Sequence, residues 1–104
     1  MTLRQRQSEF ARKVGILLIM LTEHGYEYTF GDAARIDGAG HKRGSLHYVR
    51  LALDINLFLN GKYLRSTDAY RTLGEFWESL GPDCCWGGRF NDGNHISLAY
   101  RGRK

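Results

Sequence analysis

The chain has 104 residues, of which 42% are hydrophobic and 25% charged, and its formal net charge at pH 7 is +4. This length supports one compact domain with one core and excludes two, and the composition excludes a low-complexity chain. We therefore expect a single folded domain over residues 1–104. The positive charge would draw the protein weakly toward anionic polymers, among them nucleic acid and an acidic cell wall.

We expect neither a membrane span nor a secretory signal in this sequence. Its longest apolar run, Val14 to Leu21, is much shorter than the about 20 residues that cross a bilayer. Glu9 and Arg12 interrupt the region before this run, and no small-residue cleavage site follows it. We expect a protein that is made in the cytoplasm. Cys84 and Cys85 are adjacent, which predicts free thiols because neighbouring residues rarely reach disulfide geometry.

Apolar residues recur at spacings of three and four between Leu3 and Glu23, which predicts an amphipathic helix. Thr2 is a suitable N-cap, and Gly25 a suitable left-handed residue after the C-terminus. Tyr26 to Phe30 alternates aromatic and polar residues and predicts a strand. The glycine-rich stretch from Gly31 to Gly44 is then a loop, which we expect to border the functional site.

Residues Tyr48 to Leu59 alternate apolar and other side chains, which predicts a strand with one face in the core. Asp54 lies on the opposite face of this strand. His47 is an odd number of positions from Asp54, so an unbroken strand would point the two side chains apart and separate them by about 23 Å. Binding of one ion by both residues requires a bend near Tyr48 to Leu51.

The C-terminal half predicts a hairpin, a helix and a final strand. Asn60-Gly61 is a strong turn signal, and a helix from Asp68 to Leu80 follows, capped by Ser66 or Thr67 and with Trp77 on its buried face. Residues 83–94 read as loop, and residues 95–100 alternate as a strand. His95 would share a face of the sheet with Asp54 if their strands are neighbours.

Two imidazoles and one carboxylate, from His47, His95 and Asp54, form a ligand set that suits zinc in hydrolytic enzymes. The ordered pattern around them is Ser45-x-His47, Ala52-x-Asp54, Trp86-Gly87-Gly88, Phe90 and Asp92-x-x-His95. This pattern resembles the family of zinc D-alanyl-D-alanine carboxypeptidases and L-alanyl-D-glutamate endopeptidases, which includes vancomycin-resistance dipeptidases and phage endolysins. Where that family usually has a glycine between the first histidine and the aspartate, this chain has Arg50.

The resemblance implies an α+β fold of the Hedgehog/DD-peptidase type, with a small antiparallel sheet and helices packed on one face. It implies one Zn²⁺ per chain, bound by His47, Asp54 and His95. Asp92 is the implied catalytic acid and base. Arg35 is the implied partner of the substrate or its tetrahedral intermediate, although a surface pair with Asp32 or Asp37 fits the sequence equally well. The implied substrate-binding residues are Ser45, Trp86 and Gly87.

The leading hypothesis is therefore a zinc metallopeptidase that hydrolyses an amide bond in peptidoglycan stem peptides. Such an enzyme would act as a monomer on the bacterial cell wall after release, as phage-type hydrolases do, and would not bind nucleic acid. The sequence leaves open whether it is a carboxypeptidase or an endopeptidase. Two alternatives remain: a catalytically inert zinc-binding domain, which the Arg50 departure favours, and a basic nucleic-acid-binding protein that uses exposed aromatic residues such as Tyr48 and Trp86.

Overall fold

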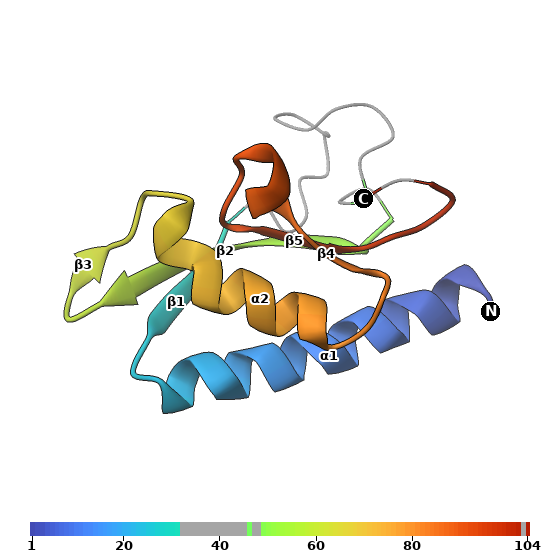
Figure 1. Ribbon diagram of the computed structural model, residues 1–104. Coiled ribbons are helices and arrows are strands. Elements are labelled where there is room, and N and C mark those ends of the chain that lie inside the picture. The colour runs from blue at the N-terminus through green and yellow to red at the C-terminus, as the bar shows by residue number, and fades with distance from the viewer. Residues whose placement is uncertain (32–45, 47–48, 103) are drawn as a thin grey trace.

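The computed structural model of the protein describes residues 1–31, 46, 49–102 and 104 (Figure 1). The described elements follow one another as α1 (Leu3–Glu23), β1 (Glu27–Phe30), β2 (Ala52–Leu59), β3 (Lys62–Tyr63), the 3-10 turn η1 (Asp68–Tyr70), α2 (Arg71–Ser79), β4 (Cys84–Trp86), the 3-10 turn η2 (Gly87–Phe90) and β5 (His95–Leu98). The α+β class expected from the sequence is confirmed.

The strands form one antiparallel sheet in the order β1-β2-β5-β4, with the short β3 paired to the end of β2. The two central strands are β2 and β5, although 35 residues separate them in the sequence. Figure 1 shows α1 and α2 side by side on the same side of this sheet. The apolar residues Leu53, Ile55 and Ile96 are buried there, and Asp54 and His95, which alternate with them, belong to the other face.

The helix α1 begins and ends at the residues that the sequence predicts. The Thr2 side chain accepts a hydrogen bond from the Gln5 backbone N–H, and the Gln5 side chain accepts one from the Thr2 N–H, which completes a capping box. Gly25 follows the C-terminal end with a φ of 85°, a conformation that costs glycine little.

Ion pairs fasten α1 to the far edge of the sheet. The Arg6 guanidinium bonds to the Glu9 and Asp83 carboxylates and donates to the Ala99 carbonyl at 2.9 Å. The Lys13 ammonium bonds to Glu9 as well and, together with Arg6, holds the pKa of that carboxyl below its ordinary value. Glu9 is therefore ionised at neutral pH and helps to hold Arg6, the residue that bonds α1 to Asp83 and Ala99.

The helix predicted from Asp68 starts as the 3-10 turn η1 and continues as α2. Ser66 is its cap, since the Ser66 hydroxyl accepts from the Ala69 N–H at 3.1 Å, whereas Thr67 makes no such bond. Trp77 lies fully buried, as predicted, and its indole N–H donates to the Ser97 carbonyl at 3.0 Å. The α2 helix is thereby tied directly to β5.

Two sequence predictions about strands are wrong. β2 begins at Ala52 and not at Tyr48, because the Leu46 carbonyl accepts hydrogen bonds from the Val49 and Leu51 N–H groups and closes a turn instead. β4 lies within the predicted loop of residues 83–94, which also holds η2. In the described part of the chain, no helix is both long and apolar enough to span a membrane.

Candidate metal centre

Asp54 and His95 come together at the middle of the sheet. They are direct partners in the register of β2 and β5, and the His95 Nδ1 atom lies 3.1 Å from the Asp54 Oδ1 atom. Both side chains are largely buried. The prediction that these residues share one face of the sheet is confirmed, and strand pairing brings them into contact.

The separation of these two atoms fits a shared zinc ion. Two donors that each lie about 2.0–2.1 Å from a tetrahedral ion are about 3.3 Å apart, close to the observed spacing. The same spacing also suits a hydrogen bond from a protonated Nδ1 to the carboxylate. An ion bound at Nδ1 would replace that proton. The two side chains can therefore either bind an ion or form the hydrogen bond, with little movement between the two states.

The third implied ligand, His47, lies outside the described residues, as do Ser45 and Arg35. Among the residues that the structure describes, no group of three histidine, cysteine, aspartate or glutamate side chains is placed to hold a metal. Two of the three implied ligands are thus brought together, and the contribution of His47 stays a prediction. The bend that this ligand set requires is present, because the turn that Leu46 closes precedes β2.

Asp92 is carried to the same end of β5 by a tight turn. The His95 N–H donates to the Asp92 carbonyl at 3.1 Å, and the Asp92 N–H donates to the Gly87 carbonyl at 2.8 Å. Asn91 has a left-handed backbone with a φ of 62°, which allows the chain to reverse after η2. The Asp92 side chain is exposed. A carboxylate three residues before a candidate ligand is therefore held by backbone bonds and open to solvent.

Gly87 is packed against both ends of that turn. A Cβ atom on Gly87 would collide with the Asp92 carbonyl oxygen and would lie 2.7 Å from the His95 Cβ. The sequence assigns Gly87 to substrate binding. The structure adds a local reason for a glycine here, since the side chain of any larger residue would collide with Asp92 and His95.

Trp86 supports the turn from inside the core. Its ring is only 2% exposed and is packed between Gly74 of α2 and Gly88 of η2. The indole N–H donates to the Gly93 carbonyl at 2.7 Å. A role of Trp86 in substrate binding stays a prediction. Because its ring is buried, Trp86 would affect the substrate through the turn that the ring supports. The exposed position expected of Trp86 by the nucleic-acid hypothesis is contradicted.

Arg89 fastens η2 to α2 on the outside. Its guanidinium forms two bonds with the Glu78 carboxylate, at 2.6 and 3.2 Å, and lies over the Trp86 ring at 5.5 Å. The hydrogen bond from Arg89 holds the pKa of Glu78 below its ordinary value. Paired groups of this kind limit the movement of η2 relative to the helix.

Arg50 occupies the position of the family glycine and keeps a glycine-like backbone. Its φ is 56°, in the left-handed region that L-residues other than glycine adopt at a cost of about 1–2 kcal/mol. The departure from the family pattern therefore leaves the turn before β2 in place. The backbone conformation at Arg50 therefore gives no reason to expect a catalytically inert site.

Replacement of Arg50 by glycine is expected to raise the free energy of unfolding by about 0.5–1 kcal/mol, because relief of backbone strain outweighs the greater freedom of the unfolded chain. Urea unfolding of the two proteins measures this difference. Arg12→Gly, in the middle of α1, is the control and should lower the stability by about 1 kcal/mol. An unchanged or lower stability of Arg50→Gly would show that the arginine side chain makes a favourable contact.

Several residues near the site have no assigned role from the sequence. Gly31 donates its N–H to the Asp54 carbonyl at 2.8 Å, and a Cβ there would lie 3.1 Å from the Asp54 Cβ. The Asn94 side chain donates to the Asn56 side chain at 3.0 Å. The exposed ring of Phe90 lies beside the His95 imidazole. Gly31 directly follows an alternating strand in the sequence. This position is the one sequence signal that could have suggested its close contact with Asp54.

The cysteines are separate from the metal centre. Cys84 is in register with Leu98 and Cys85 with Ser97, so the two side chains point to opposite faces of β4. Both thiols are free, as predicted, and burial raises the pKa of each. Protonated thiols bind zinc poorly, and the two cannot reach one ion together.

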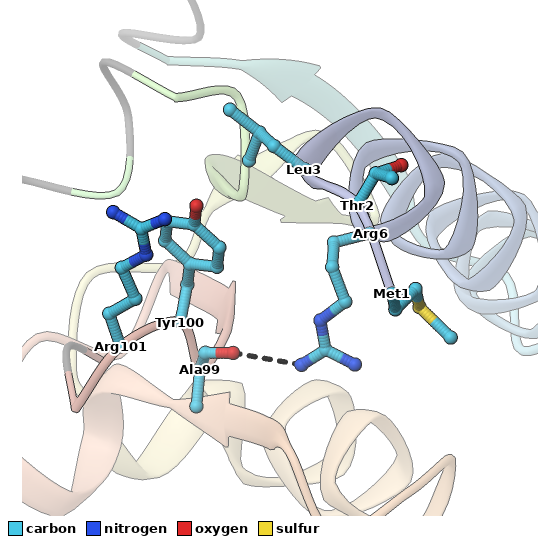
Figure 2. Close-up of a pocket in the computed structure, with 7 residues that line it drawn as sticks. All are labelled: Met1, Thr2, Leu3, Arg6, Ala99, Tyr100 and Arg101. Atoms are coloured by element: carbon cyan, nitrogen blue, oxygen red, sulfur yellow. Dashed lines mark hydrogen bonds between the residues drawn. The ribbon is translucent and has the colours of Figure 1, made fainter.

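A cleft of about 520 Å³ lies at the other end of β5 from His95 (Figure 2). Figure 2 shows the Arg6 side chain extending from α1 toward Ala99, where it donates to the carbonyl oxygen. Met1, Thr2 and Tyr100 also line this cleft. Of the predicted site residues that the structure describes, which are Asp54, Trp86, Gly87, Asp92 and His95, none lines this cleft.

The fold and the paired residues together define a small α+β protein with a candidate metal centre. Residues 39–98 match the family model described as D-alanyl-D-alanine carboxypeptidase. This segment covers more than half of the chain and includes Asp54, Asp92, His95 and the position of His47. The chain belongs to the D-alanyl-D-alanine carboxypeptidase family. Comparisons with curated proteins and with solved structures find no match.

Proposed function

We propose that the protein is a zinc-dependent peptidase that hydrolyses an amide bond in peptidoglycan stem peptides. The observation that carries this proposal is the 3.1 Å contact between Asp54 Oδ1 and His95 Nδ1, at a spacing that fits two zinc ligands. This contact lies within the segment that matches a carboxypeptidase family. The same family membership supports a peptidase over a nucleic-acid-binding protein.

Asp54 and His95 would hold the zinc ion, with His47 as the third protein ligand. The carboxylate must be ionised and the imidazoles neutral at their ligating atoms for this binding. When bound, zinc supplies a water whose pKa is near 7 and polarises the scissile carbonyl. The partial burial of the pair would strengthen these interactions, since little water competes for the ligands.

Asp92 would act as the general base and then as the acid. Its exposed carboxylate can accept the proton of the attacking water and return that proton to the leaving amine. The two backbone bonds of Asp92 hold it relative to Gly87 and His95 without using the carboxylate. The base can therefore move a proton without loss of its own support.

The substrate and the biological setting follow from the family and the charge. A net charge of +4 favours contact with an acidic wall polymer, and the family description names an alanyl-alanine bond. Arg35 and Ser45 would bind the substrate from the segment before β2. We propose a monomeric enzyme of the phage-type cell-wall hydrolases that reaches the wall after release from the cytoplasm.

Metal analysis tests the centre directly. We expect about one zinc per chain in the wild-type protein and a loss of at least about 100-fold in zinc affinity in His95→Ala, since one of three protein ligands is removed. His24→Ala is the matched control, because His24 caps the C-terminal end of α1 and its ring Nδ1 atom lies 2.9 Å from the Met20 carbonyl oxygen of that helix. Zinc binding that is unchanged in His95→Ala would contradict the ligand assignment.

Digestion of purified peptidoglycan tests the activity. Mass spectrometry of the soluble products should show new peptide ends, and their masses identify the bond that is cut. A chelator should stop the reaction and added zinc should restore it. Binding of zinc without release of fragments from wall material or from short stem peptides would instead indicate an inert zinc-binding domain.

A further inference from the structure

An exposed aromatic ring stands beside the candidate metal centre. Phe90, the last residue of η2, is 55% exposed, and its ring centroid lies 6.1 Å from that of the His95 imidazole at an interplanar angle of 56°. The fold does not use this ring as core. An apolar group of this size next to a candidate ligand is therefore available to a molecule that occupies the site.

The backbone that carries Phe90 is fixed from both sides. Arg89, the preceding residue, is bonded twice to Glu78, and Asn91, the next residue, has the left-handed conformation that ends η2. Beneath η2, Gly88 is packed on the buried Trp86 ring. The position of Phe90 is thus set by its neighbours, which is how a preorganised binding group is held.

Phe90 also lines a cleft. It has a volume of about 270 Å³, and Phe90 lines it together with Arg89, Cys85 and Pro82. This volume is close to the lower end of the about 300–1,000 Å³ of sites for drug-sized ligands, and charged residues, Glu78 and Lys104, line the cleft as well. Phe90 therefore lies beside the His95 imidazole and also lines this cleft.

We propose that Phe90 is a specificity-determining residue that contacts the substrate and favours an apolar side chain, such as the methyl group of alanine, next to the scissile bond. This inference rests on the proposed peptidase function, because it places the substrate over the Asp54–His95 pair. The ring offers the methyl group an apolar surface that water does not. Glycine at the same position of the substrate has no group to place there.

Two peptides that differ only in this group provide the test. One ends in D-Ala-D-Ala, and in the other the penultimate residue is glycine. We expect wild-type kcat/KM to favour the alanyl peptide by about tenfold or more, the usual effect of one methyl group in an apolar site. Phe90→Ala should reduce the ratio toward one while zinc content stays unchanged, and Phe90→Leu should keep part of the preference.

Phe30→Ala is the matched control. Phe30 is 53% exposed, and it is in register with Ile55, on the face of the sheet opposite Asp54. This variant should leave the preference as in the wild type. An equal change in rate for both peptides in Phe90→Ala, or no change for either, would overturn the proposal for Phe90 while leaving the peptidase function intact.

Binding of the same peptides to the zinc-loaded protein, measured by calorimetry, separates the two proposals. If the protein cuts neither peptide but binds the alanyl form more tightly, and this difference disappears in Phe90→Ala, the role of Phe90 stands and the peptidase function fails. If the wild-type protein binds neither peptide, or binds both equally, the role of Phe90 is wrong.

Discussion

Asp92→Asn is expected to lower kcat by about 10²–10⁴-fold while zinc content stays at the wild-type level, since a general base contributes a factor of this size. The change replaces one carboxylate oxygen by an amide and keeps the size of the side chain. The backbone bonds from Asp92 to Gly87 and from His95 to Asp92 do not involve the replaced group. The turn should therefore keep its shape.

Single-turnover hydrolysis and metal analysis of the same sample measure this effect. Asp68→Asn is the control, because Asp68 lies exposed at the start of η1 and pairs with Arg71. Its activity should equal that of the wild type. Full activity of Asp92→Asn would remove the assigned base, and loss of zinc from this variant would make Asp92 a ligand.

Gly87→Ala is expected to lower the free energy of unfolding by about 1–3 kcal/mol and activity by about 10²-fold. The added methyl group would collide with the Asp92 carbonyl oxygen and press on the His95 Cβ. Relief of this overlap requires Asp92 and His95 to move away from residue 87. A displacement of about 1 Å at such a centre is enough for a loss of this size.

Gly15→Ala is the matched control for Gly87→Ala. Gly15 lies within α1, and apart from its chain neighbours and the backbone of its own helix, no atom of the described residues lies within 4 Å of the position of its Cβ. Alanine there should raise the stability by about 0.5–1 kcal/mol through helix propensity. Thermal unfolding and zinc affinity are measured for both variants. Unaltered stability and activity in Gly87→Ala would show that the turn adapts without a functional effect.

Local signals predicted much of the fold. Regular spacing of apolar residues with a cap at each end fixed α1 from Leu3 to Glu23, and Asn60-Gly61 forms the expected reversal with φ values of 52° and 77°. The shared face of Asp54 and His95 also followed from alternation. These features depend on a few neighbouring residues, which is why the sequence alone is enough to predict them.

The errors arise where distant contacts decide the structure. The alternation of apolar and polar residues continues through Val49 and Leu51, so this pattern alone predicts a start of β2 that is too early. In the structure, the backbone turns at Arg50 before β2 begins. β4 has only three residues and forms because it pairs with β5. Sequence alternation likewise does not give the direct register of Asp54 with His95. That register requires knowledge of which strands are neighbours.

The placement of the two candidate ligands, Asp54 and His95, on central strands affects the order of folding. Asp54 and His95 are 41 positions apart, with a hairpin and α2 between them, so their contact closes a long loop. Early local structures, such as α1 or the hairpin at Asn60, contain at most one of the two groups. A cation that requires both would therefore bind only after the centre of the sheet has assembled, and its binding energy would favour the complete fold over partly folded chains.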